Sequence, residues 1–121
     1  IKQVSQDHSL IAEMVRLGEL APEEARNHPD KNIITRAVGT EENVEIDFFD
    51  LKLEKGQWFL MCSDGLSNMV EDNEIHRILG EASKEERDPS LALIEQANAN
   101  GGKDNIAVIA VQPFSDEVNI C

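Results

Sequence analysis

The chain has 121 residues, a length that fits one compact domain, and its 40% hydrophobic and 29% charged residues are typical of a globular protein. Its formal net charge of −13 argues against nucleic acid and anionic membranes as partners, because both require clustered Lys and Arg side chains. No apolar stretch approaches the roughly 20 residues that span a bilayer.

The first third of the chain predicts two helices and a strand. Apolar residues recur at helical spacing over residues 9–17, and Gly18 can supply the left-handed stop. Residues 22–26 begin with Pro and carry acidic residues in the first turn, which favours a short second helix. Residues 27–32 are polar and predict a loop, and residues 33–38 predict a strand.

The middle third predicts two further extended segments. Residues 43–53 alternate between apolar and polar, but the phase slips at Phe48 and Phe49, which indicates a bulge or a strand that is covered on both faces. After a turn at Gly56, residues 58–62 are apolar without alternation. Such a run predicts a strand covered on both faces.

The last third predicts two helices and one strand. Asp72 is a candidate N-cap for a helix whose buried face would hold Ile75, Ile78, Leu79 and Ala82. Asp88 and Pro89 open another helix, with Leu91, Ile94 and Ala97 on one stripe, and residues 101–102 end it. Residues 106–111 form an unbroken apolar strand. This order of helices, strands, helices and one strand predicts the α+β class.

The cysteines indicate the cellular compartment of the protein, and the first residues indicate whether the chain is part of a longer one. Cys62 lies in an apolar run, where we expect a core position with nothing to stabilise a thiolate, and Cys121 is the last residue. Neither predicts a disulfide framework, so we expect a reduced, cytoplasmic protein. No signal peptide opens the chain, and the start at Ile1 without an initiator Met suggests a piece cut from a longer protein.

Two aspartates are candidate metal ligands by their position. Asp64 follows the strand at 58–62, and Asp104 precedes the strand at 106–111. If these strands are antiparallel, both carboxylates project from the same sheet edge, beside Gly65 and residues 101–102. Crowded carboxylates with hard oxygen ligands point to Mg²⁺ or Mn²⁺. Asp-Gly and Asp-Asn are also ordinary turn dipeptides, and spacing alone leaves that reading open.

Four collinear segments resemble the PPM-type metal-dependent protein serine/threonine phosphatases, in particular their bacterial single-domain branch. The segments are SDGLSNMVEDNEI (63–75), GGKDNIAVIAV (101–111), SQDHSLIAEMVRLGEL (5–20) and APEEARNHPDKNIITRAVG (21–39). The resemblance implies a partial α-β-β-α sandwich of antiparallel sheets flanked by helices, formed by residues 1–113 as the C-terminal half of the domain. Residues 114–121 would be an acidic tail.

The resemblance also implies a chemistry. Asp64 and Asp104 match family residues that bind two active-site metal ions, Mn²⁺ or Mg²⁺, which activate a water for attack on phosphoserine or phosphothreonine. Gly65 and Asn105 would support this site, Asn105 by anchoring the loop that carries Asp104. The substrates would be phosphoproteins, and a cognate serine/threonine kinase is a candidate partner.

The departures from the family pattern limit these expectations. The N-terminal acidic pair, the Asp-Gly-x-Gly-Gly segment, the phosphate-binding Arg and the Gly-Asp-Ser-Arg segment have no counterpart here. We therefore expect weak metal binding, no catalytic residue within the chain, and little or no activity of the isolated chain. Smaller departures are Ala107 and Ala21, which stand where Thr is commoner; Ala21 removes a helix cap worth on the order of 1 kcal/mol. Half a sandwich leaves strand edges open, so we also expect homo-oligomers through those edges.

The alternative hypothesis is a non-catalytic interaction module derived from the same fold. Finding the missing acidic segments upstream of Ile1 would favour the enzyme, and a nearby start codon would favour the module.

Four further polar residues have possible catalytic or structural roles. His8 follows Asp7, a pair that could position an imidazole for proton transfer, but a structural hydrogen bond is favoured. His28, in the expected flap, is a solvated loop residue or faces substrate. His76 is expected on a helix surface, and Arg36 in a structural ion pair.

Overall fold

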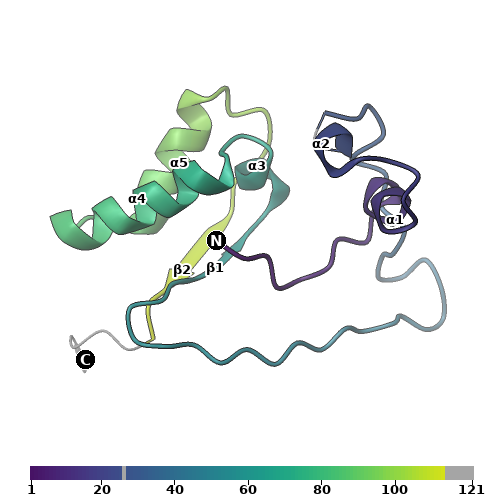
Figure 1. Ribbon diagram of the computed structural model, residues 1–121, viewed down its shortest axis with the longest axis horizontal. Coiled ribbons are helices and arrows are strands. Elements are labelled where there is room, and N and C mark those ends of the chain that lie inside the picture. The colour runs from purple at the N-terminus through teal and green to yellow at the C-terminus, as the bar shows by residue number, and fades with distance from the viewer. Residues whose placement is uncertain (26, 114–121) are drawn as a thin grey trace. The chain divides into compact units, whose positions relative to one another are not determined.

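The structure is a computed structural model that describes residues 1–25 and 27–113, so the expected acidic tail lies outside the described residues. The chain divides into two compact units. The N-terminal unit comprises Lys2–Leu51, and the C-terminal unit runs from Lys52 onward and includes Ile1. Figure 1 shows the helices and strands of each unit. In the described part of the chain, no helix combines the length and the apolarity that crossing a bilayer requires.

The N-terminal unit contains α1 (Leu10–Arg16) and α2 (Pro22–Ala25). The Ser9 hydroxyl accepts a hydrogen bond from the Ala12 N–H and caps α1, and Gly18, at φ 75°, follows its end as the sequence predicts. α2 also begins where predicted, whereas its expected end at residue 26 lies outside the described residues.

The start of α2 retains half of a capping box. The Glu24 carboxylate accepts a hydrogen bond from the Ala21 N–H at 3.3 Å, so the return bond of the box is present. Ala21 has no hydroxyl to make the other bond, which agrees with the expected loss of a cap at this position.

Two predicted strands in the N-terminal unit do not form as regular strands. In place of a strand at 33–38, the structure has a single antiparallel bridge between Ser9 and Ile34. Residues 44–53, nearly all of the predicted 43–53 strand, belong to no assigned strand. The physical reason is that a strand needs a neighbour for its N–H and C=O groups, and no described segment forms a ladder with these residues.

The C-terminal unit contains a two-stranded antiparallel sheet of β1 (Phe59–Cys62) and β2 (Val108–Val111). In its register, Phe59 is opposite Val111 and Cys62 is opposite Val108. The two strands lie side by side in Figure 1. The antiparallel pairing on which the sequence argument depended is therefore present.

Three helices accompany this sheet: α3 (Asp64–Ser67), α4 (Asp72–Glu85) and α5 (Pro89–Ala99). α3 was not predicted, because four residues carry too little periodicity to indicate a helix. All four positions predicted for the buried face of α4 are buried, although Glu71, one residue before Asp72, is its N-cap. α5 is capped by Asp88 as predicted, since the carboxylate accepts hydrogen bonds from the N–H groups of Ser90 and Leu91.

The core of the C-terminal unit lies between the helices and one face of the sheet. Its buried residues are Leu66, Val70, Ile75, Ile78, Leu79, Leu93 and Ala97. Leu60, Val108 and Ala110 pack against them from the strands, and Trp58 does so from the position just before β1. The alternating residues Met61 and Ile109 point away and are 47% and 55% exposed. The prediction that the strand at 58–62 is covered on both faces is therefore wrong, because helices cover only one face of the sheet here.

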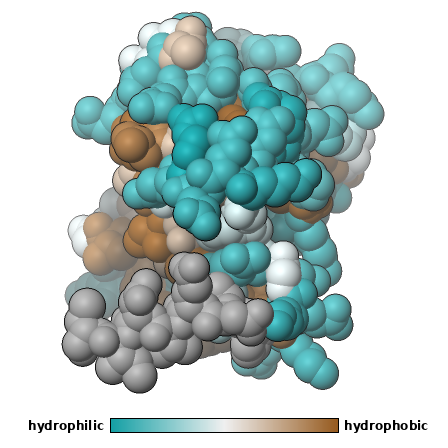
Figure 2. Space-filling view, turned by 90° about the vertical axis from the view of Figure 1, so that its left-hand side faces the viewer, coloured by the Kyte–Doolittle hydropathy of each residue, from teal (hydrophilic) through white to brown (hydrophobic). Residues whose placement is uncertain are grey.

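Two individual core predictions are also wrong. Leu91 is 54% exposed, and the buried residues of α5 are Leu93, which was not predicted, and Ala97, which was. Cys62, expected in the core, is exposed because it lies at the uncovered end of β1. Elsewhere the surface is mostly hydrophilic on the face that Figure 2 shows, with smaller hydrophobic patches between the polar residues.

Candidate metal centre

The ends of β1 and β2 bring the two candidate aspartates to one edge of the sheet. Beyond the Cys62–Val108 pair, the Ser63 N–H donates to the Ala107 carbonyl at 3.0 Å, so the ladder continues by one step. Asp64 is the next residue after this step on one strand, and Asp104 lies three residues before Ala107 on the other. Both carboxylates are at the same end of the ladder, and both residues are exposed.

The Ser63 hydroxyl joins the two chain segments that carry the aspartates. Its oxygen accepts a hydrogen bond from the Ala107 N–H at 3.0 Å and donates one to the Asn105 carbonyl at 3.2 Å. With the backbone bond of Ser63, three hydrogen bonds cross from this serine to residues 105–107. The loop that carries Asp104 is therefore attached directly to the residue before Asp64.

Gly65 lets the two segments approach closely. A Cβ atom at this position would lie 2.2 Å from the Asn105 carbonyl oxygen, a distance that real Cβ atoms essentially never show. Gly65 is buried at the start of α3. The reason for glycine at this position is steric, because only a residue without a side chain fits beside the loop.

Asn105 contacts this site through its backbone. Its carbonyl accepts from Ser63, and its N–H donates to the Asp104 carboxylate at 2.7 Å. This last bond orients the Asp104 carboxylate within its own loop. These contacts of Asn105 come from main-chain atoms, which the sequence could not indicate.

A second asparagine, which sequence reasoning missed, holds the other end of the same loop. The Asn100 side chain donates to the Met69 carbonyl at 2.8 Å and accepts from the Gln96 side chain at 3.0 Å. It thereby ties the end of α5 to the turn that follows α3. Gly101 and Gly102 come next, both with positive φ, and turn the chain toward Asp104.

The donor set fits part of a site for a hard divalent cation. Asp64 and Asp104 provide carboxylate oxygens, which Mg²⁺ and Mn²⁺ prefer. Within residues 1–25 and 27–113, no three His, Cys, Asp or Glu side chains are grouped closely enough to hold a metal ion. The two aspartates would therefore supply only a fraction of the six ligands that such an ion requires.

Cys62 offers no nucleophile at this edge. Partial burial of its sulfur, and the carboxylates of Asp64 and Asp72, raise the pKa of the Cys62 thiol. The thiol form is uncharged and a weak nucleophile, which agrees with the expectation that nothing nearby would stabilise a thiolate.

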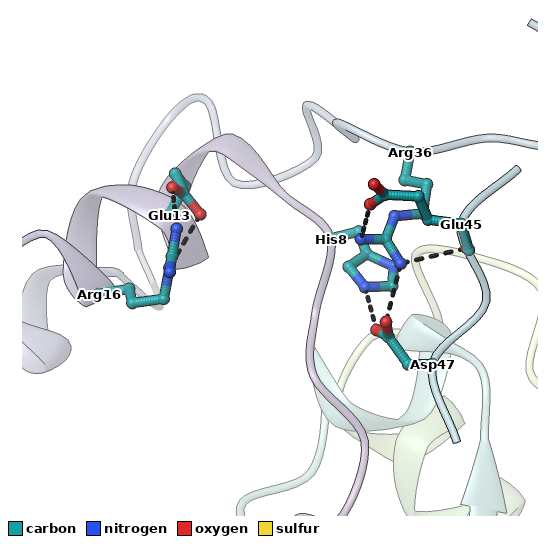
Figure 3. Close-up of polar contacts among 6 residues, drawn as sticks. All are labelled: His8, Glu13, Arg16, Arg36, Glu45 and Asp47. Carbon is teal, nitrogen blue, oxygen red and sulfur yellow. Dashed lines mark hydrogen bonds and ion pairs between the residues drawn. The ribbon is translucent and has the colours of Figure 1, made fainter. Parts of the chain in front are cut away.

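A separate cluster of charged side chains lies in the N-terminal unit (Figure 3). The His8 ring is 2.6 Å from the Asp47 carboxylate, and Arg36 bonds both Asp47 and Glu45. Arg36 and then His8 hold the pKa of the Asp47 carboxyl below its ordinary value. A polar cavity of about 330 Å³ adjoins them.

This cluster decides the roles of two residues that the sequence left between alternatives. His8 pairs with Asp47 and not with its neighbour Asp7, whose carboxylate accepts from Gln3. The Arg36 prediction of a structural ion pair is confirmed. Beside them in Figure 3, Glu13 and Arg16 form an ion pair along α1.

The other two histidines lie in a loop and on the surface of a helix. The His28 ring accepts a hydrogen bond from the Asp30 N–H at 3.2 Å, within one turn of the loop. His76 is exposed on α4, as expected.

Relatives of this chain are bacterial protein phosphatases. No protein-family model matches the chain. It is 42% identical over 112 residues to the serine/threonine phosphatase Stp of Listeria monocytogenes and 42% identical over 109 residues to the protein phosphatase PhpP of Streptococcus pneumoniae. These alignments cover 93% and 90% of this chain but only 44% of each relative. The chain thus spans less than half the length of these relatives.

Solved structures of similar sequence share the fold. The Mycobacterium tuberculosis serine/threonine phosphatase PstP/Ppp matches at a TM-score of 0.76 with 32% identity, over 90% of this chain and 45% of that one. The PPM Ser-Thr phosphatase MsPP of Mycobacterium smegmatis matches at 0.73 with 36% identity, over 90% and 46%. The PstP catalytic domain in complex with two manganese ions matches at 0.70 with 31% identity, over 90% and 44%. Helices packed on a small antiparallel sheet are thus common to this chain and to part of these proteins.

Proposed function

We propose that this chain, which is part of a protein serine/threonine phosphatase of the PPM type, contributes two metal-ligating aspartates to a site that hydrolyses phosphoserine and phosphothreonine in proteins. The observation that carries the proposal is the placement of Asp64 and Asp104 at one end of the β1–β2 ladder. The resemblance of the chain to PstP, solved with two manganese ions, supports the choice of Mn²⁺ or Mg²⁺.

The residues of this chain have a binding role in that reaction. Asp64 and Asp104 supply hard anionic oxygens, and the loop at 101–105 holds Asp104 against the strand that leads into Asp64. A divalent ion bound there lowers the pKa of a coordinated water and stabilises charge on phosphoryl oxygens. The other metal ligands and the groups that grip phosphate belong, in this proposal, to the part of the domain that this chain does not match.

The charge of the chain favours protein substrates over nucleic acids. A net charge of −13 repels phosphate backbones and anionic membranes, so specificity for a phosphoprotein must come from local contacts at the metal edge. A serine/threonine kinase that makes these phosphoproteins is the proposed partner, and the cytoplasm is the proposed compartment.

The isolated chain is proposed to self-associate. Residues 44–51 are extended, apolar at several positions and without a strand partner among the described residues. Exposed apolar segments of this kind pair with other chains. A second copy of this chain is the proposed occupant when the rest of the domain is absent.

Metal binding tests the proposed ligands. Mn²⁺ titrated into the chain should bind weakly by calorimetry, and Asp64→Asn should reduce the affinity further because it removes one of two anionic ligands. Asp50→Asn is the matched control, since it removes the same charge from an exposed position in the N-terminal unit. Equal Mn²⁺ binding by wild type and Asp64→Asn would remove Asp64 from the site.

The activity of the isolated chain provides a second measurement. With Mn²⁺ and p-nitrophenyl phosphate, we expect hydrolysis close to background, because two carboxylates hold a metal pair poorly and no phosphate-binding Arg has been assigned in this chain. Mn²⁺-dependent turnover that Asp104→Asn abolishes would show that this chain carries a complete site.

A further inference from the structure

The Ser63 hydroxyl does not form the hydrogen bond that is usual for its position in the chain. It is the N-cap residue of α3, the position where a serine hydroxyl commonly accepts a bond from the first turn of the helix. Here the hydroxyl makes no capping bond. It instead bonds the Asn105 carbonyl and the Ala107 N–H on the segment that leads into β2.

We propose that Ser63 is a positioning residue that sets the separation of Asp64 and Asp104 for metal binding. The inference rests on the proposed function, because it assumes that these two aspartates are ligands. It assigns to the hydroxyl a role that neither helix capping nor regular sheet pairing explains.

The geometry explains why a side chain is needed at this point. Regular pairing ends at Cys62 and Val108, and one further backbone bond joins Ser63 to Ala107. Beyond that bond the two segments diverge, one into α3 and the other into the loop at 101–105. The Ser63 hydroxyl reaches past the last backbone bond to residue 105, next to Asp104.

Two contacts restrict the movement of the loop that carries Asp104. Gly65 lies against the Asn105 carbonyl, so the loop cannot move toward α3 without a clash. The Ser63 hydroxyl bonds the same carbonyl and keeps the loop from moving away. The contact at Gly65 thus limits how close the loop can come, and the hydrogen bond of Ser63 limits how far it can move away.

Three variants of the chain test the role of the hydroxyl. Ser63→Ala removes both side-chain bonds, and Ser63→Thr keeps a hydroxyl. Ser83→Ala is the matched control, because the Ser83 hydroxyl also has two partners, the Trp58 ring N–H and the Leu79 carbonyl, but lies in α4. Asp64→Asn reports on the ligand assignment itself.

The measurement is Mn²⁺ affinity, read from calorimetry and from paramagnetic broadening of amide signals in NMR spectra of the labelled chain. Ser63→Ala should weaken Mn²⁺ binding about tenfold, the size expected when a group that supports a ligand is removed. Ser63→Thr should restore most of the affinity, and Ser83→Ala should leave it unchanged. Amide hydrogen exchange at Ala107 should accelerate in Ser63→Ala, which shows that the loop has been released in a folded chain.

The outcomes separate this inference from the proposed function. Normal Mn²⁺ binding by Ser63→Ala, together with weakened binding by Asp64→Asn, would overturn the positioning role and leave the ligands in place. Unchanged binding by Asp64→Asn would overturn the proposed site and the inference with it. If Ser63→Ala does not fold, Ser63→Thr decides: a folded Thr variant that binds Mn²⁺ about tenfold or more weakly than Ser83→Ala contradicts the proposal.

Discussion

At the scale of single residues, Gly65 shows how backbone contact shapes the candidate site. The Asn105 carbonyl occupies the space that a side chain at this position would need. Gly80, in the middle of α4, has no atom within 4 Å of the equivalent Cβ position. The two glycines therefore have opposite physical roles, although nothing in their immediate sequence separates them.

Alanine at these two positions should change stability in opposite directions. Gly65→Ala forces the loop away from α3 and should destabilise the C-terminal unit by about 1–3 kcal/mol, the range for an inserted methyl in a packed site. Gly80→Ala should stabilise it by about 0.5–1 kcal/mol, because alanine has the better helix propensity. Urea unfolding followed by fluorescence of Trp58, the single tryptophan, measures both. Equal stability of Gly65→Ala and wild type would contradict the close approach.

At the scale of elements, α5 shows where periodicity succeeds and where it fails. The cap at Asp88 and the end at the glycines follow from the sequence. The buried stripe follows only in part. Ala97 is buried as predicted, but Leu91 is exposed, because apolar residues lie on more than one side of this helix. Packing against α4 and β2 selects Leu93, which is 0% exposed.

Replacing each of these two leucines of α5 by alanine should show, from the loss of stability, which side of the helix is buried. Leu93→Ala creates a cavity in the core and should destabilise the C-terminal unit by about 2–5 kcal/mol. Leu91→Ala, at a half-exposed position, should stay within about 0.5 kcal/mol of wild type. Both are read from urea unfolding with Trp58 fluorescence. A larger loss of unfolding free energy for Leu91→Ala than for Leu93→Ala would mean that α5 buries a different side from the one described here.

At the scale of the whole molecule, the chain exposes apolar residues that a complete domain would be expected to cover. The extended segment at 44–51 includes Phe48, which is 88% exposed, and Ile46, which is 66% exposed. The outer face of the β1–β2 sheet adds Met61 and Ile109. The relatives are more than twice as long as the matched region, which agrees with missing neighbours for these surfaces.

Self-association of the isolated chain should therefore depend on the extended segment. Sedimentation velocity over a range of concentrations should detect dimers or larger species for the wild-type chain. Phe48→Ser should shift the distribution toward monomer, because it removes the most exposed aromatic side chain of this segment. Leu17→Ser, which changes an exposed leucine elsewhere in the N-terminal unit, should have little effect. A wild-type chain that stays monomeric at all concentrations would contradict the proposal.

The sequence by itself determined the local features of this protein. The start of α1 at Ser9, the four buried positions of α4 and the cap at Asp88 follow from side-chain periodicity and local hydrogen bonding, which depend on residues close in the chain. The motifs around Asp64 and Asp104 also indicated the phosphatase family without any coordinates.

Only the tertiary structure decided the features that depend on distant partners. The bond of the Ser63 hydroxyl to Asn105 and the pairing of His8 with Asp47 join residues about forty positions apart, which no local pattern encodes. The segments at 33–38 and 43–53 have the composition of strands, yet they form no ladder here. A strand is stabilised by hydrogen bonds to a neighbour, whereas a helix contains its own, so sequence determines a helix far better than it determines a sheet.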